Sequence, residues 1–186
     1  LDKSLANMDE ERFRAGLSAK VDVSVRIAQV FDREPLDFVM FFSSINSFTK
    51  SPGQSNYASG CTFKDIFAHQ LSLHSLSEVK VMNWGYWANV GIVATKDYQE
   101  RMAQAGLGSI EPREALAALE NLLAGPINQV ALVKTTKSQA LVKVNPDKSI
   151  YIYPEKLVSH IERVKNDMPK LEFSSQRRQS EMEAYK

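Results

Sequence analysis

Three polar side chains in this sequence of 186 residues are of types that can act together on a carbonyl group. Lys20 falls on the apolar face of an expected helix, Ser44 follows an apolar run, and Tyr57 stands near the start of another expected helix. A tyrosine hydroxyl titrates at about 10, so it needs a nearby cation to exchange a proton at neutral pH. Lys20 could supply that charge while Ser44 hydrogen-bonds the same substrate oxygen. Together they suit protonation of an alkoxide that forms as hydride reaches a carbonyl carbon.

Each of the three residues also has an ordinary structural explanation. A lysine beside an apolar helix face usually reaches solvent along its aliphatic chain. A pair of serines after a strand usually serves turns and caps, and a single tyrosine usually lies between core and solvent. Each residue alone is therefore weak evidence for catalysis, and only the spacing of all three favours it.

The hydrophobic pattern predicts the elements that must position these side chains. Apolar residues recur at three- and four-residue spacing over 9–31, which predicts a helix, and the run over 36–42 predicts a strand covered on both faces. This alternation of helix and strand predicts an α/β fold with a Rossmann-like, doubly wound parallel sheet. Ser44 and the helix of Tyr57 then emerge at the carboxyl ends of the strands, where such sheets bind ligands. Further helices are expected at 56–73, 96–105 and 112–123, and further strands at 79–84, 129–133 and 140–144.

One part expected of such a fold is missing from the sequence. A dinucleotide-binding fold carries a Gly-rich phosphate-binding turn of the G-x-G-x-x-G type, and this sequence has none. Leu1 also stands first, without an initiator Met. We therefore expect a fold that is incomplete at its N-terminus, in a fragment, a processed product or a trimmed chain.

The composition excludes several classes of protein. Lys and Arg number 23 and Asp and Glu 22, without a sustained basic run, so nucleic acid and anionic membranes are poor partners. No apolar stretch approaches the roughly 20 residues that span a bilayer, and the first residues do not resemble a secretory signal. A single cysteine excludes an internal disulfide and a multi-cysteine metal site. We expect a soluble, cytoplasmic protein without a metal.

Short motifs follow the expected strands and helices, and together they are highly specific. They are Ala19-Lys20-Val21-Asp22, Phe41-Phe42-Ser43-Ser44, Ser51-Pro52-Gly53-Gln54-Ser55-Asn56-Tyr57-Ala58 and Asn83-Trp84-Gly85-Tyr86-Trp87. Over about residues 1–143 the sequence closely resembles ketoreductase domains of type I polyketide synthases, which belong to the short-chain dehydrogenase/reductase superfamily. By this resemblance Tyr57 is the proton donor, Ser44 orients the carbonyl, and Lys20 lowers the pKa of the tyrosine.

The resemblance also implies a cofactor, partners and a domain layout. The cofactor is NADPH, and the residues on its nicotinamide side are Trp84, Gly85, Gly91 and Ile92. The substrate is a β-ketoacyl chain on the phosphopantetheine of an acyl carrier protein, and further partners are the missing N-terminal half and neighbouring synthase domains. Residues 1–144 then form the C-terminal, catalytic part of the ketoreductase, with a lid over 96–108. Residues 145–186, which include an expected helix at 154–164, form a linker.

One residue departs from the family pattern. The family usually carries Asn four residues after the tyrosine, where it helps to hold the lysine, and Cys61 stands there. A thiol is a poor hydrogen-bonding substitute for an amide. The variant resembles ketoreductases of trans-acyltransferase synthases. Lys64 lies seven residues after Tyr57, on a similar helix face, and could help in place of the amide, but it is expected to be a solvated lysine. The alternative function is a catalytically silent scaffold or an interaction segment within a megasynthase.

Two positions bear on the stereochemistry of the product. The family is sorted by an Asp upstream of the lysine, which is Asp2 here, and by a Trp upstream of the tyrosine, where Thr49 stands. By resemblance this is the B-type pattern, which gives a D-configured β-hydroxyl.

Overall fold

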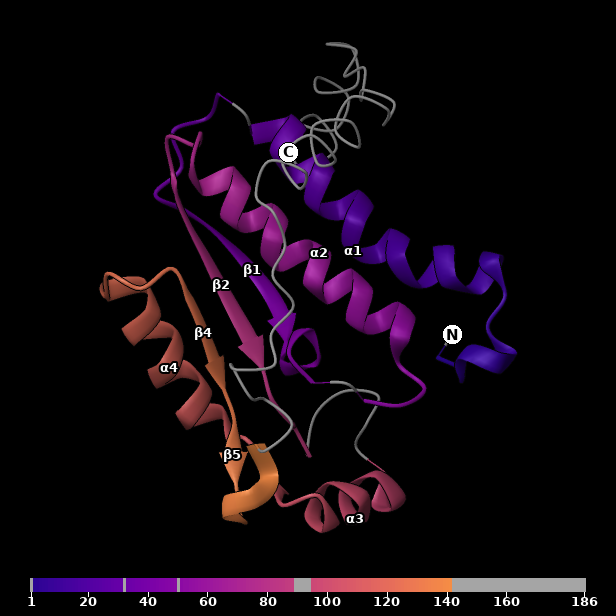
Figure 1. The fold of residues 1–186 in the computed structure, drawn as a ribbon. Coiled ribbons are helices and arrows are strands. Elements are labelled where there is room, and N and C mark those ends of the chain that lie inside the picture. Colours follow the sequence, from indigo (N-terminus) through magenta and orange to yellow (C-terminus); the bar gives the residue numbers. More distant parts are fainter. Residues whose placement is uncertain (1, 32, 50, 89–94, 142–186) are drawn as a thin grey trace, which may run out of the picture.

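The computed structural model describes residues 2–31, 33–49, 51–88 and 95–141 (Figure 1). The helices are α1 (Glu10–Phe31), α2 (Ser55–Ser72), α3 (Lys96–Gln104) and α4 (Pro112–Ala124), and the strands are β1 (Phe38–Ser44), β2 (Glu78–Trp84), β3 (Leu107–Gly108), β4 (Gln129–Leu132) and β5 (Lys134–Thr135). Short 3-10 turns lie at Leu5–Asn7, Ile45–Ser47 and Ser138–Leu141. The four expected helices within these ranges are thus confirmed to within two residues. The expected linker and its helix lie outside the described residues.

The main sheet is parallel, in the order β1-β2-β4. β1 and β2 pair along their whole length, from Phe38 opposite Glu78 to Ser44 opposite Trp84. The expected α/β fold with a parallel sheet is confirmed. Its consequence for the site is that Ser44 and Trp84 end neighbouring strands at the same edge.

Helices cover both faces of this sheet. Figure 1 shows α1 and α2 together on one side of the strands and α4 on the other. Successive side chains of a strand point to opposite faces, so Val79 and Val81 of β2 face α2, whereas Lys80 points toward the end of α4. The buried Lys80 ammonium donates to the main-chain oxygens of Gly125 and Ile127, at 3.0 and 3.3 Å. These bonds hold the turn between α4 and β4 against β2.

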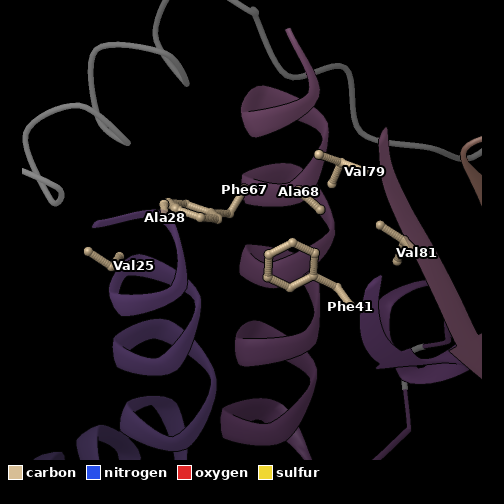
Figure 2. Close-up of a cluster of buried hydrophobic side chains, with 7 residues drawn as sticks. All are labelled: Val25, Ala28, Phe41, Phe67, Ala68, Val79 and Val81. Atoms are coloured by element: carbon tan, nitrogen blue, oxygen red, sulfur yellow. The ribbon is translucent and has the colours of Figure 1, made fainter. Parts of the chain in front are cut away.

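An apolar cluster joins α1 and α2 to the sheet. Figure 2 shows its side chains, which come from both helices and from β1 and β2. The rings of Phe41 and Phe67 meet edge to face, with centroids 6.5 Å apart, and Phe63 stacks on Phe67. Burial of such rings is the main source of stability here. The cluster fixes the helix that carries Tyr57 against the strand that ends in Ser44.

Two expectations about the strands are wrong. The strand over 36–42 was expected to be covered on both faces, but Phe38 and Phe42 are 46% and 54% exposed. Their rings point away from α2, and α4 packs against β2 and β4 rather than over β1. The strand expected at 140–144 is also not formed where the structure describes it, because Ala140 and Leu141 belong to a 3-10 turn. β5 instead pairs with β3, and these two-residue strands are too short to leave a sequence pattern.

None of the helices in the described ranges has the length and hydrophobicity of a membrane-spanning segment.

Candidate active site

The hydroxyls of Ser44 and Tyr57 meet at the carboxyl edge of the sheet. Ser44 is the last residue of β1, and Tyr57 lies in the first turn of α2, which begins after the loop over 45–54. The Ser44 hydroxyl lies near enough to Tyr57 to lower the pKa of its phenol. The two hydroxyls can therefore contact one substrate oxygen together.

Lys20 reaches this pair from α1. Its Nζ lies 4.3 Å from the centroid of the Tyr57 ring. Its aliphatic chain crosses α2 at Gly60, where a Cβ would lie 2.7 Å from Lys20 Cδ. Real Cβ atoms essentially never come so close, so the absence of a side chain at Gly60 makes the room that Lys20 occupies.

Tyr57 is held in its protonated form. Burial raises the pKa of its hydroxyl above the ordinary value, and the nearby Cys61 and Asp2 raise it further, whereas the Ser44 hydroxyl lowers the pKa. A protonated phenol beside Ser44 is the form that a proton donor needs. The net direction is opposite to the lowering expected from Lys20, because burial dominates, and that lowering stays a prediction.

Cys61 is fully buried behind Tyr57. Burial raises the pKa of its thiol, while the nearby Lys20 ammonium and a hydrogen bond with Tyr57 act in the opposite direction. The group that faces Tyr57 at neutral pH is therefore a thiol rather than a thiolate. This protonation state does not suit a nucleophile.

A buried polar network supports the main chain of Ser44 from inside the sheet. The side-chain amide of Asn83 donates to Ser44 O at 3.1 Å and to Asp65 Oδ2 at 2.7 Å, and Asn83 Oδ1 accepts from Gln129 Nε2 at 2.8 Å. Burial raises the pKa of Asp65, although the nearby hydroxyls of Ser43 and Ser47 and the hydrogen bond from Asn83 lower it. Sequence reasoning gave no role to Asn83 or Asp65. For Asn83 the signal in the sequence was a polar residue inside an apolar strand, and for Asp65 it was a polar residue on an apolar helix face.

The sequence of this chain matches a known protein family and known relatives. A family model described as the KR domain matches residues 1–89, which include Lys20, Ser44 and Tyr57. Polyketide synthase PksN of Bacillus subtilis (strain 168) is 53% identical over 168 residues. The chain belongs to the ketoreductase family of polyketide synthases.

Further relatives agree with this ketoreductase assignment. Polyketide synthase PksM of the same strain is 51% identical over 168 residues. The alignments cover 90% of this chain, but only 3% of PksN and 4% of PksM. A ketoreductase domain from the bacillaene assembly line superposes with a TM-score of 0.69 at 23% identity, over 78% of this chain and 36% of that one. That likeness supports the fold.

Lys64 of the ketoreductase differs from the solvated lysine expected. It is half-buried, and its Nζ donates to Phe42 O at 2.8 Å. Burial lowers the pKa of the ammonium, and the charge of Lys20 lowers it further. Two cations therefore approach the buried Cys61, from α1 and from α2.

Three further residues of the predicted site, Asp2, Trp84 and Gly85, lie in the described part of the chain. Asp2 is exposed, and its carboxylate accepts a hydrogen bond of 3.4 Å from Gln54 Nε2. Trp84 is half-buried between the rings of Phe42 and Trp87, with centroids at 5.6 and 5.2 Å. A Cβ at Gly85 would lie 2.7 Å from Leu132 O, so the approach of β4 requires glycine there. Gly91 and Ile92 lie outside the described residues.

Within the described ranges, no group of three His, Cys, Asp or Glu side chains is arranged to hold a metal ion.

Proposed function

We propose that this ketoreductase chain reduces the β-keto group of an acyl chain on the phosphopantetheine of an acyl carrier protein. The product is a β-hydroxyacyl chain, and the hydride comes from NADPH. The observation that carries the proposal is the protonated Tyr57 beside Ser44, with Lys20 Nζ 4.3 Å from the centroid of its ring. Relatives that are synthases, together with the balanced charge of the chain, favour a cytoplasmic location.

The residues of the site have separate tasks in this reaction. The hydroxyls of Ser44 and Tyr57 hydrogen-bond the substrate carbonyl oxygen and orient it. NADPH, when bound, supplies the hydride that adds to the carbonyl carbon. The π electrons of the carbonyl move to its oxygen, and Tyr57 donates its proton to that oxygen. The phenolate left on Tyr57 is stabilised by the ammonium of Lys20 and by the Ser44 hydroxyl.

The described residues fit the nicotinamide end of NADPH. Tyr57, Ser44 and Lys20 lie together at the carboxyl edge of a parallel sheet, the edge at which such sheets bind dinucleotides. This arrangement supports their proposed roles as proton donor, orienting hydroxyl and cation. We propose that the phosphate-binding turn belongs to an N-terminal half that pairs with this chain, because the sequence has no G-x-G-x-x-G turn.

The finer proposal is a D-configured hydroxyl. It is supported by the position of Asp2, which bonds to Gln54 and lies near enough to Tyr57 to raise its pKa. A carboxylate there can contact the arm of an incoming substrate and favour one face of the carbonyl. About 1.4 kcal/mol of preference in the transition state is already tenfold.

The second candidate is a catalytically silent scaffold. It is favoured by Cys61, a buried thiol at the position where the family carries an amide.

Tyr57→Phe decides between the two candidates. In a ketoreductase completed by its N-terminal half, this variant should lose about 10²–10⁴-fold in kcat, because general acid catalysis contributes that much. Turnover of a β-ketoacyl thioester, followed by NADPH absorbance, measures it. Asn121→Ala, at an exposed position on α4 away from the site, is the control and should keep the turnover of the parent. Turnover of Tyr57→Phe within twofold of the parent would contradict the assigned role, and an inactive parent would favour the scaffold.

A further inference from the structure

The loop over 45–54 joins Ser44 to the helix of Tyr57, and the side chain of Asn46 binds both of its halves. Asn46 Oδ1 accepts from Thr49 Oγ1 at 2.9 Å and from Ser51 Oγ at 3.4 Å. Asn46 Nδ2 donates to Gln54 Oε1 at 3.0 Å. One half-buried amide thus connects the start, the middle and the end of the loop.

Asn46 also contacts the site at both ends of this loop. Its main-chain N–H donates to Ser44 Oγ at 3.2 Å. Its partner Gln54 immediately precedes α2, whose first turn carries Tyr57, and the same Gln54 side chain donates to Asp2. A continuous path of polar contacts therefore runs from Ser44 through Asn46 and Gln54 to Asp2.

Main-chain bonds close the first turn of this loop. The N–H groups of Phe48 and Thr49 donate to Ile45 O, which closes a turn directly after Ser44. Pro52 and Gly53 follow, and Gly53 has a φ of +79°, a left-handed turn conformation that favours glycine. The hydrogen bond from Asn46 to Gln54 spans this turn and fixes the distance between the two ends of the loop.

We infer that Asn46 is a positioning residue of the ketoreductase. It sets the separation of the Ser44 and Tyr57 hydroxyls and ties both to Asp2, so that rate and product configuration depend on one amide. The inference rests on the proposed function. Its physical basis is that a misplacement of about 1 Å at a reacting centre can cost up to about 10²-fold in rate.

The test is Asn46→Ala in the completed ketoreductase. We expect kcat to fall about tenfold, because the loop loses the amide that spans it. The KM for NADPH should stay within twofold, and the share of the minor hydroxyl epimer should rise at least threefold in chiral chromatography. Asn121→Ala, at an exposed position on α4, is the matched control and should leave all three values unchanged.

A second variant separates positioning from folding. Gln54→Ala removes the same amide bond from its other end, and the double variant should lose no more than the worse single variant. Values of kcat and epimer ratio within twofold of the parent in Gln54→Ala would overturn the inference, even if Asn46→Ala fails to fold. An inactive parent, or a fully active Tyr57→Phe, would count against the proposed function. An active parent with an unchanged Asn46→Ala would count against the role of Asn46 alone.

Discussion

Two polar networks hold the same serine, and they differ in burial. Asn83 and Asp65 support the main chain of Ser44 from within the sheet, with exposures of 0% and 6%. The loop outside holds its hydroxyl through the main-chain N–H of Asn46. The side chain of Asn46 bonds to that of Gln54, where both amides are half-buried and Asp2 is exposed. A buried polar group that loses its hydrogen-bond partner destabilises the fold by its full desolvation free energy, whereas an accessible group can bond to water instead. The inner network should therefore govern stability, and the outer one only the geometry of the reaction.

The largest expected effect is on the inner network. Asn83→Leu removes the donor to Ser44 O and Asp65 Oδ2 and leaves a buried carboxyl group with fewer partners. We expect the free energy of unfolding to fall by about 3 kcal/mol, measured by urea denaturation of the completed domain. Asn46→Ala should change it by less than about 0.5 kcal/mol. Equal losses in the two variants would remove the distinction between the networks.

A smaller effect concerns pH. The pKa of Asp65 is raised above its ordinary value of 3.8 in the folded protein, so the folded state binds this proton more tightly than the unfolded state does. Stability from this group is complete below pH 3.8 and is lost as the pH rises through the folded pKa. Asp65→Asn should therefore flatten the fall of stability above that pH. Melting temperatures across pH 4–8 measure it against the parent, and an unchanged pH profile would mean that Asp65 ionises as freely as in the unfolded chain.

The smallest effect is expected at Cys61. Its thiol is a weak hydrogen-bonding group, although it is fully buried. Cys61→Ala should keep kcat within about threefold of the parent, and Cys61→Asn, which restores the family's amide, should preserve or raise it. The measurement is the steady-state kinetics of β-ketoacyl thioester reduction, with a melting curve for each variant. Complete loss of kcat in Cys61→Ala would contradict this expectation and would mean that the thiol is needed for the reaction.

The elements that position the site were predictable from the sequence. The apolar spacing that ends at Phe31 and the run that leads to Ser44 are local patterns, so α1 and β1 needed no knowledge of their partners. The exposure of Phe42 was not predictable in this way, because it depends on which helix covers that side of the sheet.

Both polar networks were missed for different reasons. Asn83 forms hydrogen bonds with Asp65, Ser44 and Gln129, which are 18, 39 and 46 residues away in the sequence. No local sequence pattern predicts contacts at such separations. Asn46 and Gln54 lie in a loop rich in Ser, Pro and Gly, a composition that predicts a turn but not the side chain that closes it. The gathering of Lys20, Ser44 and Tyr57 was visible only through the family's spacing.

The aromatic corner beside the site has an optical consequence. Trp84 and Trp87 are the two tryptophans of the sequence, and their rings lie 5.2 Å apart at the carboxyl end of β2. The tryptophan fluorescence of the chain therefore originates at one corner of the sheet, next to the strand that ends in Ser44. A change in emission on adding a nucleotide or a thioester would report on that corner directly, without an attached dye.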